Sequence, residues 1–161
     1  MRWNLGRILF WVILVTASLS AMPGRADFWD GLAAYDADNF AEARDQWQPL
    51  AAAGDAQAQA TLAGLYAQGL GVPPSPSRAA DWFRRAAAQG HVIGQLNLGD
   101  YYARGHGVSR DLAKAWLWLS LAARQGNRWA ANRRDAIEAQ LSPVELMSAQ
   151  QRLAAWRAIA E

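Results

Sequence analysis

Apolar and small residues between positions 55 and 90 recur with the spacing of helices that turn one face toward a core. Ala58, Leu62 and Tyr66 follow one another at intervals of four residues, so they fall on one side of a first helix. A second helix is predicted where the contact residues lie three or four positions apart, at Ala79, Trp82, Phe83, Ala86 and Ala87. Because Ala lets helices approach closely while Leu, Tyr and Trp fill the space between them, the pattern predicts a packed helix pair.

The same pattern returns in the next stretch of the chain. Residues 55–90 align without a gap with residues 91–126, and 13 of the 36 positions are identical. In the first copy these positions are Gln59, Leu62, Tyr66, Ala67, Gly69, Gly71, Val72, Ala79, Trp82, Ala86, Ala87, Gln89 and Gly90. A fixed period of this length is typical of stacked repeats. The sequence therefore predicts an all-α fold, an α-solenoid of helix-turn-helix repeats.

Glycines and capping residues predict where these helices end and begin. The glycines placed to end helices, where a left-handed conformation is free of strain only for Gly, are Gly69, Gly90, Gly105 and Gly126. Ser75 before Pro76 supplies a start signal for one second helix, and Ser109 or Asp111 supplies it for the other.

The pattern extends to both sides of the two copies. Upstream, residues 27–54 form a first repeat with a shorter connection, since Ala43 and Trp47 lie 36 residues before their counterparts. Downstream, residues 127–161 are predicted to form a C-terminal helical cap, because repeat arrays need their exposed end covered. A capping box at Ser142–Glu145 starts the last helix. Its apolar side is predicted at Met147, Ala154, Trp156 and Ile159.

Residues 1–26 have the layout of a secretory signal peptide. Arg2 and Arg7 flank a positively charged n-region, and an apolar run covers residues 8–19. Small residues at Gly24 and Ala26 then offer a cleavage site. The alternative is an uncleaved membrane anchor, but the run is shorter than the ~20 residues that cross a bilayer. We therefore expect a periplasmic or secreted protein, cleaved near Ala26, with no stable membrane insertion afterwards.

Processing would change the charge balance. The chain has 16 Lys and Arg against 14 Asp and Glu, and removal of Arg2, Arg7 and Arg25 turns the small positive excess into near neutrality. The arginine pairs at 84–85 and 133–134 are then better interpreted as solvated helix faces than as a nucleic-acid surface. The chain has no Cys, so it has no disulfide and no thiolate metal site.

The two copies, residues 55–90 and 91–126, resemble the Sel1-like repeat family, which is related to the tetratricopeptide repeats. The residues of the second copy that carry the resemblance are Gln95, Leu98, Gly99, Tyr102, Gly105, Gly107, Val108, Ala115, Trp118, Ala122, Ala123 and Gly126. Two departures are mild, Ala63 for Gly and Gly94 for Ala, and residues 28–54 look more like a plain tetratricopeptide unit. The resemblance implies a solenoid whose first helices line a concave face, and an adaptor in protein–protein interactions. Exported bacterial members are often tied to envelope processes.

Candidate binding residues are the first-helix positions offset from the Leu and Tyr core face. They are Gln57, Thr61, Leu65 and Gln68 in one copy, and Ile93, Asn97, Asp100, Tyr101 and Arg104 in the other. Each is also compatible with an ordinary solvent-facing position, since few interface residues contribute much binding energy. The tryptophans at 47, 82 and 118 recur in the core phase and are predicted to pack, whereas Trp116 and Trp129 have no counterpart one repeat earlier.

Catalytic and cofactor sites are not indicated. His91 and His106 are the only histidines, they occupy variable repeat positions, and they lack the spacing of a zinc motif. The two G-x-G elements end helices and follow no strand, which argues against dinucleotide binding. The prediction is a non-catalytic exported adaptor that needs no cofactor or metal and binds a protein or peptide. The alternatives are a hydrolase of envelope polymer, with these histidines as its only plausible bases, or a signal-anchored membrane protein.

Overall fold

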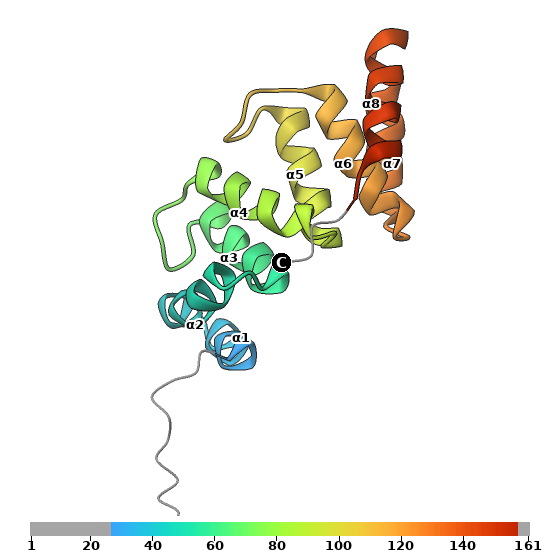
Figure 1. The fold of residues 1–161 in the computed structure, drawn as a ribbon. Coiled ribbons are helices and arrows are strands. Elements are labelled where there is room, and N and C mark those ends of the chain that lie inside the picture. Colours follow the sequence, from blue (N-terminus) through green and yellow to red (C-terminus); the bar gives the residue numbers. More distant parts are fainter. Residues whose placement is uncertain (1–26, 158–161) are drawn as a thin grey trace, which may run out of the picture.

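The computed structural model describes residues 27–157, and this part of the chain is all-α (Figure 1). Its helices are α1 (Phe28–Asp36), α2 (Phe40–Ala52), α3 (Ala56–Gln68), α4 (Pro76–Ala88), α5 (Val92–Arg104), α6 (Leu112–Arg124), α7 (Arg128–Glu138) and α8 (Pro143–Ala155). Each helix from α1 to α6 packs on the next one along the chain. The predicted all-α solenoid is confirmed. The predicted signal peptide lies outside the described residues.

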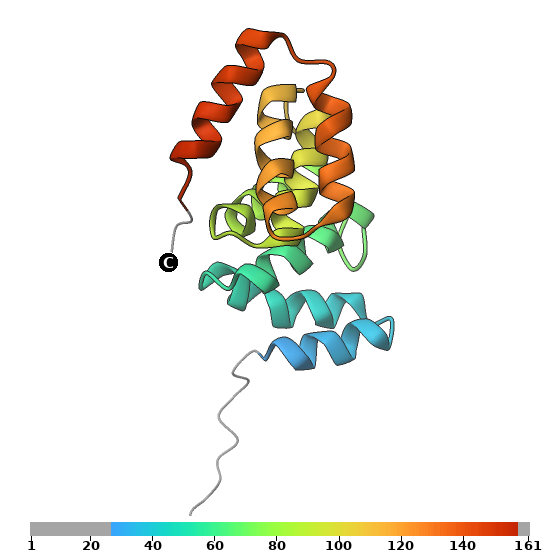
Figure 2. The same cartoon turned by 90° about the vertical axis from the view of Figure 1, so that its right-hand side faces the viewer.

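The last helix departs from the alternating order. It packs on α6, so α7 and α8 lie on opposite sides of α6 (Figure 2). Its buried face is formed by Ala149 and Leu153, whereas Met147 is 55% exposed. The predicted apolar face was therefore wrong at Met147 and Ala154, because the contact of α8 with α6 selects another side of the helix. Trp156, which directly follows α8, does pack against the core, and Ile159 lies outside the described residues.

Most predicted helix ends are confirmed. Ser75 and Asp111 accept hydrogen bonds from the first turns of α4 and α6, and Ser142 and Glu145 form the capping box of α8. Gly69 and Gly105 adopt left-handed conformations directly after α3 and α5, with φ of 73° and 69°. None of the helices between residues 27 and 157 is long and apolar enough to span a bilayer.

The second glycine of each G-x-G element joins neighbouring repeats. Gly107 has a φ of 68°, and its Cα lies so close to the backbone of Pro76, in the first turn of α4, that a Cβ would overlap it. Gly71 has the same relation to Phe40 at the start of α2, and its carbonyl accepts from Nη1 of Arg44 at 3.1 Å. These glycines therefore fix the packing of one repeat on the preceding one.

Two glutamines per repeat form a second inter-repeat link. Gln59 is buried and donates from Nε2 to the carbonyl of Ala51 at 3.0 Å, while its Oε1 accepts from Gln89 at 3.0 Å. Gln95 and Gln125 form the same link one repeat later, at 2.9 Å. A buried amide is favourable only when it is hydrogen-bonded. This arrangement explains why both glutamines are identical in the two copies.

The core also accounts for most of the tryptophans. Trp47 is completely buried, and Trp82 and Trp118 are partly buried against the core, as predicted. Trp116 is buried too, and its Nε1 donates to Glu138 of α7 at 2.7 Å. This contact ties the last full repeat to the C-terminal cap.

Candidate functional site

The first helices of the repeats, α1, α3, α5 and α7, begin in the same way. In each, the residue before the helix accepts a hydrogen bond from the first turn; these caps are Asp27, Asp55, His91 and Asn127. With the caps aligned, the second helical residue is Trp29, Gln57, Ile93 and Trp129 in turn. The helical period then places residues four, seven and eleven positions later on the same side.

We name one continuous surface on these helices the first-helix strip. Its members over α3, α5 and α7 are Gln57, Thr61, Gln68, Ile93, Asn97, Asp100, Arg104, Trp129 and Arg133. All of them are exposed or half-buried. Seven of the nine predicted binding residues lie on this strip.

The other two predicted residues, Leu65 and Tyr101, are corrected by the structure. Leu65 is 1% exposed and Tyr101 8% exposed, and both belong to the core. Each lies to one side of the strip, about 40° around its helix from Thr61 or Asn97 and about 80° from Gln57 or Ile93, at 100° per residue. That direction is covered because α3 and α5 each pack between two second helices. The ring of Tyr101, for example, meets the ring of Phe83 on α4 edge-on at 5.5 Å.

Charges gather where the strip crosses from α5 to α7. The carboxylate of Asp100 forms an ion pair with Nε of Arg104 at 2.8 Å and accepts a hydrogen bond from Nη2 of Arg133 at 2.7 Å. Asp100 is only 16% exposed, whereas Arg104 is 64% exposed. The guanidinium of Arg133 also lies over the ring of Trp129, 5.6 Å from its centre. These contacts join α5 to α7 and hold the polar and aromatic groups in a fixed arrangement.

The α3 part of the strip is uncharged. Thr61 donates from its hydroxyl to the carbonyl of Gln57 at 2.8 Å, and Gln68 lies one turn beyond Gly64. Oε1 of Gln57 meets Nε2 of His91 at 2.9 Å, which links α3 to the start of α5. The strip therefore changes from neutral to charged along the stack.

His91 is the N-terminal cap of α5. Its Nδ1 accepts from the backbone N–H of Gly94 at 3.2 Å, so the proton of the neutral ring sits on Nε2 and faces Gln57. Burial lowers the pKa of His91 and the charge of Asp55 opposes this in part. Protonation at Nδ1 would replace the cap acceptor by a donor.

We expect the stability of the chain to fall as the pH decreases from 7.5 to 5.5. The pKa of His91 is lower in the folded than in the unfolded chain, so the unfolded chain takes up the proton first, from about pH 6.5 downward. Urea unfolding at both pH values measures the difference. The variant His91→Asn keeps a cap acceptor, as Asn127 does in α7, and should reduce the slope. An equal slope in both proteins would assign the pH dependence to other groups.

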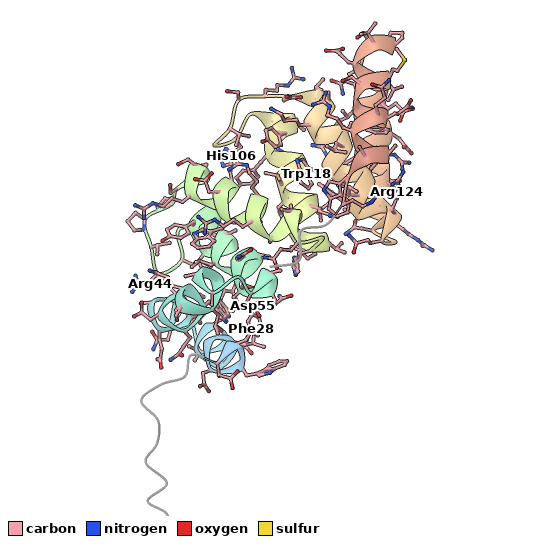
Figure 3. The ribbon with its side chains drawn as sticks, in the orientation of Figure 1. Phe28, Arg44, Asp55, His106, Trp118 and Arg124 are labelled. Atoms are coloured by element: carbon pink, nitrogen blue, oxygen red, sulfur yellow. The ribbon has the colours of Figure 1, made fainter. Side chains whose placement is uncertain are left out.

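The two histidines cannot serve one catalytic site. His91 caps the start of α5, so about 20 Å of helix lies between it and the far end of α5 at 1.5 Å per residue. His106 follows that far end, beside the turn to α6 (Figure 3). Within residues 27–157, no group of three or more His, Asp or Glu side chains is placed to hold a metal ion.

Sequence reasoning missed two members of the strip, Trp129 and Arg133. The signal was present, because they lie 36 residues after Ile93 and Asn97. The core residues that are identical between the repeats do not recur after Gly126, so the 36-residue period was not extended to residues 127–161. Ile93 is 47% exposed and Trp129 49% exposed, so α5 and α7 carry bulky apolar groups at equivalent positions of the strip. Trp29, 70% exposed, has the same position on α1.

Comparison with known proteins identifies the repeat. The Sel1 repeat model matches residues 56–91 and 92–127, one residue later than the predicted units. A solved structure of c5321, a protective antigen present in uropathogenic Escherichia coli strains that displays an SLR fold, matches with a TM-score of 0.74 and 29% identity over 78% of this chain. A Sel1 repeat protein from Oxalobacter formigenes matches with a TM-score of 0.67 and 26% identity over 81% of this chain.

The chain covers 28% of the first of these structures and 56% of the second, so it corresponds to only part of each. None of the curated proteins matches the chain in sequence. The family match, the two structures and the repeated Gln and Gly contacts nevertheless agree. Residues 56–127 are two Sel1 repeats, and the solved structures that this chain resembles have the same repeat fold.

Proposed function

We propose that this chain is an exported, non-catalytic adaptor that binds a segment of another protein across the first-helix strip. Sel1 repeats generally mediate protein–protein interactions, which supports the general role. The secretory pattern of residues 1–26 supports a periplasmic or secreted location after cleavage near Ala26. Binding of the partner at the strip is supported by the exposed side chains of the strip. Most residues that are identical between the repeats pack in the core and are not available to a partner.

The observation that carries the proposal is the pair of exposed apolar side chains on α5 and α7. Ile93 and Trp129 stand at equivalent positions, and the bridge from Asp100 to Arg133 links the two helices at 2.7 Å. Aromatic residues and Arg are enriched among the residues that dominate binding energies. Because packed helices already fix these groups, a partner would lose little entropy in ordering them.

Cross-linking in intact cells tests this proposal. A photo-reactive amino acid at Asn97, on the strip, should capture a defined partner that mass spectrometry can identify. The matched control carries the same group at Asp81, an exposed position of α4. Trp129→Ala should reduce capture from Asn97 while leaving the melting curve nearly unchanged. Equal capture from both positions, or capture that Trp129→Ala does not alter, would show that the strip is not the binding surface.

A further inference from the structure

We infer that the segment bound at the α5–α7 part of the strip is acidic and carries a bulky apolar side chain. This inference rests on the proposed function and adds the chemistry of the partner. It is drawn from the distribution of charge along the stack, from the unequal pairing around Asp100, and from the neighbouring apolar groups.

Charge is distributed unevenly along the repeats. Residues 27–56, which include α1 and α2, contain seven Asp or Glu and one Arg. Residues 57–157 contain six Asp or Glu and twelve Lys or Arg. The chain is close to neutral in total, yet its first repeat is acidic and the remainder is basic. Opposite charge on a partner therefore favours the later repeats, and like charge disfavours the first.

The pairing on the strip leaves positive charge available. Asp100 serves both Arg104 and Arg133, so one carboxylate faces two guanidinium groups. Each guanidinium has five N–H donors, and Asp100 faces Nε of Arg104 in an ion pair and accepts a hydrogen bond from Nη2 of Arg133. The terminal nitrogens of the exposed Arg104 thus remain able to bind a partner carboxylate in the paired geometry that Arg favours. Arg128, next to Trp129, adds a further exposed cation.

Apolar groups flank this charge. Ile93 lies one turn before Asn97 on α5, and Trp129 lies beneath Arg133 on α7. A bulky side chain placed over these two residues would bury apolar surface that is now about half exposed. A segment with carboxylates on either side of such a residue would satisfy both features at once.

At the other end of the strip the charge is reversed. Asp36 of α1 occupies the position that corresponds to Asp100, and α1 and α2 also contain Asp30, Glu42 and Asp45. An acidic segment would be repelled there. The opposite charges of the two ends would thus set the direction in which a longer partner lies along the stack.

Binding of labelled peptides to the protein expressed from the full chain tests the inference. The probe is a ten-residue peptide in which Glu alternates with Leu, and the comparison peptide has Lys in place of Glu. Fluorescence anisotropy should show the Glu peptide binding about tenfold or more tightly at low salt, with the difference shrinking as salt increases. Arg104→Glu should weaken this binding by about tenfold.

Arg124→Glu is the matched control, because it makes the same change of charge at the end of α6, off the strip (Figure 3). It should alter the affinity by less than about twofold, and thermal melting should show both variants folded. Tighter binding of the Lys peptide, or equal effects of the two variants, would overturn the inference. So would the absence of peptide binding, or binding only to vesicles of anionic phospholipid. Capture of a basic partner from Asn97 would overturn it as well, while the proposed function would stand.

Discussion

Replacing Trp47 with alanine is expected to lower the free energy of unfolding by about 3–5 kcal/mol, as for other buried aromatic residues. Trp47 is completely buried, its ring stacks on Phe28 at 5.6 Å, and its Nε1 donates to the carbonyl of Phe28 at 3.0 Å. It also fills the space against Gly31. The variant therefore loses the main contact between α1 and α2. Denaturant unfolding followed by circular dichroism measures the change.

The loss should be concentrated at one end of the stack. In a solenoid each repeat contacts only its neighbours, so the α1–α2 pair is held on one side alone. Hydrogen exchange should accelerate in α1 and α2 before it does in α5 and α6. Trp29→Ala is the control, because Trp29 lies on α1, the helix on which Trp47 packs, but is 70% exposed. A similar loss of stability in both variants would contradict the packing described for Trp47.

The repeat period predicted those parts of the fold that depend on local sequence. The contact residues of the first helices, the N-caps Ser75 and Asp111, and the glycine C-caps all follow from helical spacing and backbone preference. Leu65 and Tyr101 did not follow, because their burial depends on a second neighbouring helix. A first helix packs on the second helix of its own repeat and on that of the preceding repeat. Its buried face is therefore wider than the face that contacts the helix of its own repeat alone.

Contacts between repeats were the least predictable feature. The sequence showed that Gly107 and Gln95 are identical to their counterparts, but it did not show what they touch. The same limit applies to the candidate site. Arg133 looked like part of a solvated arginine pair, whereas it reaches back 33 positions to Asp100 and helps to form the strip. Side chains that connect repeats become visible only when the stacking geometry is known.

The second large expected effect on stability concerns Gly107, which lies against the backbone of α4. Gly107→Ala should destabilise the chain by about 2–4 kcal/mol, combining the strain of a left-handed backbone with overpacking. The added Cβ would meet the backbone of Pro76 and Ser77, which sits in the capped first turn of α4 and cannot move as a side chain would. The expected outcome is a shift in the denaturant midpoint, measured by circular dichroism.

Gly126→Ala separates the two causes. Gly126 has a φ of 89°, and nothing lies within 4 Å of the position its Cβ would take. It should therefore cost only the strain of the backbone, about 1–2 kcal/mol. If the two variants lose the same stability, Gly107 is required for its conformation alone. If Gly107→Ala loses clearly more, the excess measures the close approach of one repeat to the preceding one, which would explain why the second glycine of G-x-G is repeated.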